Sequence, residues 1–412
     1  MHKERAIREG PLLAVLAIIQ FTTMLDFLIM MPLGPQYMRV FDITPAQFGT
    51  IVSAYAVCAG VAGLASGTLL DRFDRRHSLL FLYTGFGFAT LLCALAPGYL
   101  SLTVARGLAG AFGGVSGAVI MAIIGDVIPE HRRGRAMGLV MSSFSLASVL
   151  GVPIGLWLAN LFSWHAPFFM LAAASVPVLV GAYLLTPHIH AKPHGENDTL
   201  VKHLARIIGV PSHVRAFAFI GMVTLGGFLV IPYISPYMVL NVGLRESELP
   251  YIYLAGGLCT IFSMNLIGRL ADRYGKRRVF TVMVLCAIGA TLVLTHLSPV
   301  RTPLAIACTT VFMICMSGRF VPAMALMTSV VTRRLRGGFM GVSSAVQNLS
   351  AGLGSYLGGL ILTETSSGRL KGYGAIGWIS AVVALVSLGL CFTLSLAPEE
   401  TADGGEILEP AM

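Results

Sequence analysis

The chain has 412 residues, of which 56% are hydrophobic and only 11% are charged. Roughly 25% of the residues of an ordinary soluble domain are charged, so this composition excludes a water-soluble protein and makes lipid the solvent for most of the chain. The formal net charge of +9 does not indicate a nucleic-acid partner, because the basic residues fall in short turns between apolar runs. All seven cysteines lie inside apolar runs without metal-ligand spacing, so we expect neither a disulfide nor a metal site.

The apolar runs predict an all-α integral membrane protein. A spanning helix needs roughly 20 mainly apolar residues. We expect spans near 11–33, 47–70, 78–97, 100–124, 136–160 and 165–186, then near 214–240, 249–270, 278–297, 303–328, 337–362 and 374–397. The predicted units are an N-terminal six-helix bundle, a cytoplasmic linker, a C-terminal six-helix bundle and a cytoplasmic tail, over residues 1–186, 187–213, 214–398 and 399–412.

The basic residues predict which ends of the spans face the cytoplasm. They gather at the N-terminus, in the central linker and in the turns after spans 2, 4, 8 and 10. The opposite turns hold only Arg39, Arg245, Arg301, Arg369 and Lys371. Because positive charge marks the cytoplasmic side, we expect a multi-pass protein of the plasma membrane, the inner membrane in a bacterium, with both termini in the cytoplasm.

In the first span, Asp26 is the carboxylate that lies well inside an apolar segment. A charged Asp at the centre of a span costs roughly 2.5–3.5 kcal/mol on insertion scales, so its side chain should face the bundle interior or a water-filled cavity. Burial disfavours the anion and a nearby cation favours it, so such a group can bind and release a proton as the cavity alternates. The alternative is a permanent ion pair that only locks the span to a neighbour.

The turn after span 2 recurs after span 8. Residues 67–76 (GTLLDRFDRR) match residues 268–277 (GRLADRYGKR), which places Asp71 and Asp272 at an offset of 272 − 71 = 201 residues. Met137-Gly138 and Met340-Gly341 continue the repeat at a similar offset. The two halves are therefore predicted to be parallel repeats, which in transporters place a substrate site between the halves near the midplane.

Arg106 in span 4 is the natural partner of Asp26. Span 4 enters from the outer side, so Arg106 lies roughly 9 Å below the outer edge at 1.5 Å per residue. On the same rise Asp26 lies about 22 Å from the inner edge, which is a similar depth. An ion pair between them is geometrically allowed. The alternatives are that Arg106 reaches to the outer interface or caps backbone carbonyls.

Arg319 in span 10 is not the repeat equivalent of Arg106, since the repeat offset of 201 to 203 residues leads near Thr309 instead. It lies about 21 Å from the cytoplasmic side at 1.5 Å per residue. Three roles stay open for this side chain: binding an anionic or polar substrate group, pairing with Asp26 across the cavity, or contacting helix C-terminal carbonyls.

Other polar side chains interrupt the spans and suit hydrogen bonds to a polar ligand, although bonds between helices are the simpler interpretation for each one alone. Span 7 carries Tyr233 and Tyr237 one turn apart, and its two adjacent glycines and two prolines should bend it. The further candidates for substrate binding are Gln20, Asn265, Gln347 and Asn348.

With these features the chain resembles the major facilitator superfamily of transporters over essentially its full length. The turn at Asp71 is similar to that family's signature loop between spans 2 and 3, and the turn at Asp272 to its weaker echo. Residues 106–110 (RGLAG) resemble the Arg-x-x-x-Gly motif associated with proton coupling. Residues 151–155 (GVPIG) resemble the Gly/Pro motif of antiporters in sugar-efflux and drug-efflux members, except that Leu156 stands where a second Gly is common.

The resemblance implies twelve transmembrane helices in two six-helix parallel repeats, the major facilitator fold, and a monomer. The antiporter-like motif falls on Gly151, Pro153 and Gly155. The resemblance also implies a latch that favours the outward-facing state, although the same arginines would serve plain topology determination. The latch residues would be Gly67, Asp71, Arg72, Arg76, Asp272 and Arg273.

The sequence as a whole predicts a secondary active transporter of a small molecule without a cofactor. The main hypothesis is efflux by proton antiport, with Asp26 and Arg106 as the proton-coupling residues; a proton-coupled importer or a uniporter comes second, and a non-transporting sensor third. No Gly-x-x-x-x-Gly-Lys-Ser/Thr loop supports ATP drive, and no nucleophile–base pattern indicates an enzyme. The substrate stays open between lipophilic cations, which suit a single membrane Asp, and polar compounds or anions, which suit Arg319.

Overall fold

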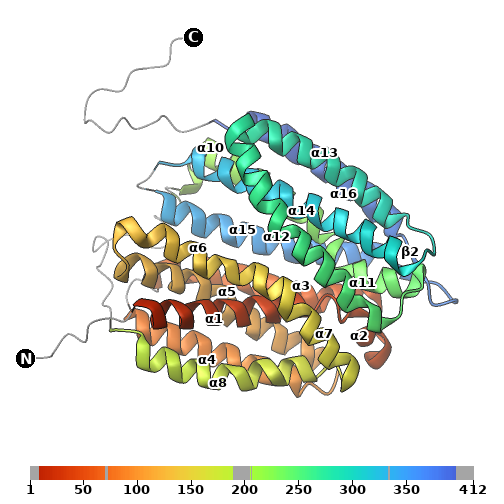
Figure 1. Ribbon diagram of the computed structural model, residues 1–412, viewed down its shortest axis with the longest axis horizontal. Coiled ribbons are helices and arrows are strands. Elements are labelled where there is room, and N and C mark those ends of the chain that lie inside the picture. Colours follow the sequence, from red (N-terminus) through yellow and green to blue (C-terminus); the bar gives the residue numbers. More distant parts are fainter. Residues whose placement is uncertain (1–8, 70–72, 189–204, 206, 333–334, 396–412) are drawn as a thin grey trace, which may run out of the picture.

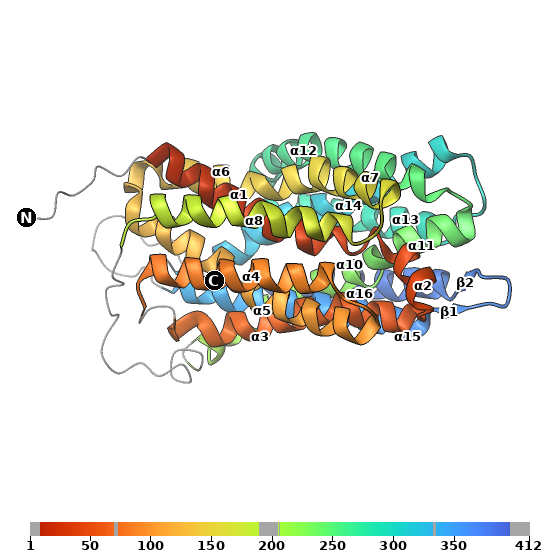
Figure 2. The same cartoon turned by 90° about the horizontal axis from the view of Figure 1, so that it is seen from below.

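A computed structural model describes residues 9–69, 73–188, 205, 207–332 and 335–395. Long helices run along one direction, with the N-terminal half below the C-terminal half in Figure 1. Both ends of the described chain lie at the same end of this bundle, which we call the terminal end (Figures 1 and 2). The other end carries a short β-hairpin and is called the hairpin end.

Within the described residues, the N-terminal half contains eight α-helices and one π-helical turn. They are α1 (Glu9–Ile29), α2 (Gly34–Phe41), α3 (Pro45–Leu69), α4 (Arg75–Ala94), α5 (Tyr99–Val127), α6 (Glu130–Leu146), η2 (Ala147–Gly151), α7 (Val152–Leu161) and α8 (Ala166–Leu185). Segments α6, η2 and α7 follow one another without a gap and together form the fifth span.

The C-terminal half repeats this order with more interruptions. Its helices are α10 (Pro211–Phe228), η3 (Ile231–Tyr233), α11 (Ile234–Tyr237), η4 (Met238–Val242), η5 (Glu246–Glu248), α12 (Leu249–Tyr274), α13 (Lys276–Thr295), α14 (Thr302–Val330), α15 (Arg336–Ile361) and α16 (Tyr373–Thr393). Strands β1 (Thr363–Glu364) and β2 (Leu370–Lys371) pair antiparallel between α15 and α16. The sequence patterns did not predict this small hairpin.

The predicted spans correspond to the helices of the structure. Eleven helical segments of the described residues are long and apolar enough to cross a membrane. The remaining long helix, α15, has 26 residues, and its many Gly and Ser residues together with Gln347 and Asn348 reduce its apolar character. The prediction of an all-α protein with twelve spans is confirmed. Between the halves, α8 ends at Leu185 and α10 begins at Pro211; most of the predicted linker and the predicted tail lie outside the described residues.

Both halves begin with a broken helix. In the first, α1 ends at Ile29 and the chain resumes as α2 at Gly34; in the second, α10 ends at Phe228 and the chain passes through η3 into α11. Pro35 and Pro236 lie near these breaks at an offset of 236 − 35 = 201 residues, the offset of the duplicated turn. Proline has no backbone N–H to donate, so it favours a break in the helix. Because the two prolines are one repeat offset apart, we interpret the broken helix as part of the repeat. The predicted bend in span 7 is confirmed.

The two halves contact each other through α3 with α15, and through α12 with η2 and α7. Glycine permits the first contact: a Cβ on Gly352 would lie 2.7 Å from Cγ2 of Val57, and one on Gly359 would lie 2.7 Å from the carbonyl O of Pro45. Polar contacts close the hairpin end. Arg39 pairs with Glu246 across the halves, and Nδ2 of Asn160 donates to the carbonyl O of Glu246 at 3.3 Å.

Candidate functional site

A buried ion pair lies inside the N-terminal half, between α1 and α5. Nη1 of Arg106 donates to Oδ2 of Asp26 at 2.6 Å and to the carbonyl O of Asp26 at 3.2 Å. Asp26 is 0% exposed and Arg106 is 1% exposed. The hydroxyl of Thr90 lies 3.5 Å from Oδ1 of Asp26, and the guanidinium lies 4.5 Å from the ring centroid of Tyr55. The pair that the depth estimate allowed is therefore present.

The glycine of the Arg-x-x-x-Gly motif explains how Arg106 reaches this place. A Cβ on Gly110 would collide with the carbonyl group of Tyr55, so only glycine lets α5 approach the backbone of α3 so closely. That approach brings the ring of Tyr55 over the guanidinium one turn away on α5. The aromatic face then stabilises the cation independently of the carboxylate.

The glycines of the antiporter-like motif pack against the helix that carries Asp26. A Cβ on Gly151 would lie 2.8 Å from Cδ1 of Leu25, and one on Gly155 would lie 2.7 Å from Cδ1 of Ile29. Pro153 occupies the first turn of α7, directly after the π-helical turn η2. Proline cannot donate the helical hydrogen bond, which fits an irregular turn just before it. The motif therefore sets the position of α1, and its role in antiport stays a prediction.

Arg319 lies inside the C-terminal half and not beside Asp26. It is 2% exposed, its Nη2 donates to the carbonyl O of Val223 at 3.0 Å, and its Nη1 is buried without a partner. No carboxylate pairs with it in the part of the chain that the structure describes. The acceptor lies inside α10 and not at a helix C-terminus, and the role of Arg319 in substrate binding stays a prediction.

The remaining substrate-binding candidates face neighbouring helices or the exterior. The hydroxyls of Tyr233 and Tyr237 donate to the carbonyls of Ser355 and Leu297. Gln20 is buried with Oε1 unpartnered, Asn348 is half-buried, Gln347 donates to the Ser343 carbonyl, and Asn265 is exposed on α12. Their binding of substrate stays a prediction. None of them lines the cavity described below.

The predicted latch is only partly described. Asp71 and Arg72 lie outside the described residues, and Gly67 lies near the end of α3. Arg76 donates to the carbonyl O of Tyr183 at 2.6 Å. Asp272 and Arg273 are exposed in the last turn of α12, where the guanidinium lies 5.3 Å from the ring centroid of Tyr274. The latch itself stays a prediction.

A cavity lies between the two halves, with about 140 Å³ of space for the centres of water-sized molecules. Its lining includes no charged side chain among the described residues. It is lined by Leu28, Met31, Pro32, Phe144, Ser145, Ser148, Val152, Ile231, Ile234, Tyr253, Gly257, Thr260, Ile261, Met264, Thr309, Phe312, Met313, Met316 and Ser317. Sequence reasoning missed these residues, since most are apolar residues in apolar spans. The available signal was Thr309, which lies near the repeat position of Arg106.

Helix α1 joins the ion pair to the cavity. Asp26 faces Arg106 inside the half, whereas Leu28, two residues later, lines the cavity. Two residues correspond to roughly 200° around a helix of 3.6 residues per turn, so the two side chains project from nearly opposite faces. One helix therefore carries both a member of the ion pair and part of the cavity lining.

The comparisons with known proteins identify the class. The sequence profile of the Major Facilitator Superfamily matches residues 16–316 and 216–411, and the chain belongs to this family. It is therefore an integral, multi-pass membrane transporter.

Two relatives and one solved structure illustrate the similarity. The inner membrane transport protein YdhP of Escherichia coli is 28% identical over 378 residues, which cover 90% of this chain and 92% of that protein. A probable sugar efflux transporter of Helicobacter pylori is 25% identical over 248 residues, covering 60% and 62%. The fold is similar to an inward-facing crystal structure of a bacterial homologue of the lysosomal transporter Spinster, with a TM-score of 0.76 and 17% identity, covering 94% and 96% of the two chains.

Proposed function

We propose that this chain exports an apolar or amphiphilic small molecule in exchange for protons across the inner membrane of a bacterium. The observation that carries the proposal is the arrangement on α1, where a buried carboxylate–guanidinium pair and an uncharged cavity occupy opposite faces of one helix. With both termini in the cytoplasm, as the basic residues predict, the hairpin end, where Arg39 and Glu246 join the two halves, faces outward. An inward-facing state is part of this proposal. Transport by a monomer is part of this proposal.

The surroundings of Arg106 support proton exchange at Asp26. If Asp26 takes up a proton, Arg106 loses its counter-charge but keeps the ring of Tyr55 and the carbonyl O of Asp26. A buried cation without any partner would be very unfavourable, so these two contacts lower the cost of the protonated state. Asp26 can thus change its charge while the N-terminal half stays folded.

The cavity lining favours an apolar substrate over a polar or anionic one. Part of the cavity wall consists of methionine side chains, which are flexible and polarisable and adapt to ligands of different shapes. They are Met31, Met264, Met313 and Met316. A few hydroxyls, among them Ser148 and Thr309, are placed to fix the orientation of a ligand. Those same hydroxyls, with the name of the Helicobacter pylori relative, support sugar efflux as the second candidate.

Counterflow and pH-jump measurements in proteoliposomes test the proposal. We expect an imposed pH gradient to drive the export of tetraphenylphosphonium or of a neutral hydrophobic dye. Radiolabelled monosaccharides should be transported poorly. Asp26→Asn should abolish pH-driven transport and leave substrate binding intact. Undiminished pH-driven transport by that variant would refute the role of Asp26, and efficient sugar transport would favour the second candidate.

A further inference from the structure

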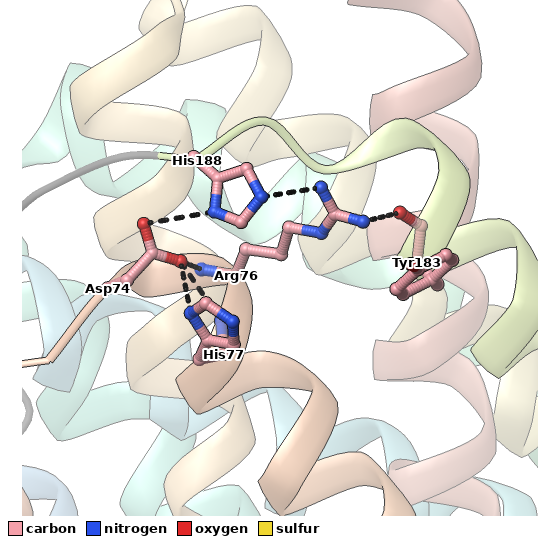
Figure 3. Close-up of polar contacts among 5 residues, drawn as sticks. All are labelled: Asp74, Arg76, His77, Tyr183 and His188. Carbon is pink, nitrogen blue, oxygen red and sulfur yellow. Dashed lines mark hydrogen bonds and ion pairs between the residues drawn. The ribbon is translucent and has the colours of Figure 1, made fainter.

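A second polar cluster joins the start of α4 to the segment after α8, and Figure 3 shows it with its neighbours Arg76 and Tyr183. Asp74 and His77 come from the start of α4, and His188 comes from the segment that follows α8. One ligand atom from each of the three lies within 4.8 Å of the others. We call these three residues the Asp74 cluster.

Asp74 presents a carboxylate that is held in place and incompletely satisfied. It caps the N-terminus of α4, where its Oδ1 accepts the backbone N–H groups of Arg76 at 3.0 Å and His77 at 3.1 Å. Its Oδ2 is buried and has no hydrogen-bond partner. A buried, unsatisfied carboxylate oxygen is unfavourable, and a bound cation would satisfy it.

The two histidines bring nitrogen ligands to this carboxylate. Nδ1 of His77 lies 3.2 Å from Oδ1 of Asp74, and Nδ1 of His188 lies 3.7 Å from Oδ2. Ligand atoms around a tetrahedral zinc ion are roughly 3.3 Å apart, given bonds of about 2.0–2.1 Å. Both rings are exposed, so an ion can reach the site from water without a rearrangement of the bundle.

We propose that Asp74, His77 and His188 bind a divalent transition-metal ion of the zinc type and so join the start of α4 to the segment after α8. The mixed imidazole and carboxylate ligands suit zinc, cobalt or nickel rather than calcium or magnesium. Water would complete the coordination. Sequence spacing gives no sign of this site, because 188 − 77 = 111 residues separate the two histidines.

Arg76 competes with the metal for His188. Its Nη1 lies 3.0 Å from Nε2 of His188, and its Nη2 donates to the Tyr183 carbonyl (Figure 3). A neutral histidine that binds a metal through Nδ1 carries its proton on Nε2. The Nε2–H of His188 would then face the N–H of Arg76, and two donors cannot form a hydrogen bond with each other. Metal binding and the Arg76–His188 contact therefore exclude each other. The metal would release Arg76 from His188 and leave its hydrogen bond to the Tyr183 carbonyl.

The test is zinc binding to the full-length protein in detergent after chelator treatment, measured by equilibrium dialysis and by the visible spectrum of bound cobalt. Removing one ligand, as in His188→Ala or His77→Ala, should weaken binding about tenfold or more. Asp74→Asn should do the same and still cap α4, because asparagine is also a good N-cap. Arg76→Leu should tighten binding several-fold, since the competing donor is gone.

His131→Ala is the matched control, because His131 is exposed in the first turn of α6. It should bind zinc and cobalt as the wild type does, and the thermal unfolding of every variant in detergent shows whether it is folded. The proposal is overturned if the wild type binds no zinc at 100 µM, or if His77→Ala and His188→Ala bind it as tightly as the wild type. It is equally overturned if the cobalt spectrum is unchanged in these two variants.

Discussion

Each half of the protein buries an arginine, and the two have different surroundings. Arg106 pairs with Asp26 and lies over the ring of Tyr55. Arg319 contacts the Val223 carbonyl, and its Nη1 has no partner among the described residues. The N-terminal half therefore places a carboxylate beside its buried arginine, whereas the described residues of the C-terminal half place none beside Arg319.

The repeat shows where the difference arises. An offset of 201 carries Asp26 to 26 + 201 = 227, which is a glycine. Nη2 of Arg319 lies 3.3 Å from the place that a Cβ on Gly227 would occupy. The C-terminal half thus brings a guanidinium to the position that corresponds to Asp26 and has no side chain there. This asymmetry assigns the proposed proton exchange to the N-terminal half.

The largest expected contrast is between methionine substitutions of the two arginines. Arg106→Met leaves the buried Asp26 without its partner and should lower the free energy of unfolding by about 3–5 kcal/mol. Arg319→Met removes an incompletely satisfied cation and should change it by less than about 1 kcal/mol. Chemical denaturation in detergent measures both. Equal destabilisation by the two substitutions would contradict the comparison.

Restoring the missing carboxylate tests the asymmetry directly. Gly227→Asp should be tolerated in the wild-type background, because Arg319 can pair with the new carboxylate, and should be destabilising when combined with Arg319→Met. The coupling free energy between the two changes should be about 0.5–3 kcal/mol, the range of residues in contact. A double-mutant cycle of unfolding free energies provides it, and additive effects would show that the two residues do not meet.

The ring of Tyr55 should contribute less than the carboxylate does. Tyr55→Leu removes the aromatic face beside Arg106 and should cost about 2 kcal/mol if the contact is desolvated. Tyr55→Phe retains the face and serves as the matched control. Unfolding measurements on both variants test the contact: Tyr55→Phe should cost much less than Tyr55→Leu, and equal losses would show that the aromatic ring does not stabilise Arg106.

The smallest expected effect concerns the contact that joins the halves at the hairpin end. Arg39 and Glu246 form an exposed ion pair, so Glu246→Gln should change the free energy of unfolding by only about 0.2–1 kcal/mol. It should nevertheless open the hairpin end more often, because the contact joins the two halves there. Accessibility of a cysteine introduced at Phe48 to a thiol reagent added from that end measures the opening; unchanged labelling would count against this contact as a closure.

Several features of this protein followed from local sequence. Runs of apolar residues predicted the membrane class and the spans, because lipid requires long apolar helices whose backbone is satisfied internally. The duplicated turn predicted the two-fold repeat. A pair of Asp26 and Arg106 was one of the arrangements that the sequence allowed, because a charge deep in a span is costly unless it is compensated and their depths agreed.

Tertiary structure alone decided which side chains meet around the cavity and at the terminal end. In a span that is apolar all round, the sequence does not distinguish a cavity-facing methionine such as Met313 from a lipid-facing residue. Substrate binding by Tyr233, Tyr237 and Arg319 stays a prediction. The sequence did not show that each of them donates to a backbone carbonyl of another helix or loop, because such carbonyls satisfy buried donors wherever helices cross. The meeting of His77 with His188 depends on how α4 and α8 pack side by side, and contacts between residues so distant in sequence exist only in the folded chain.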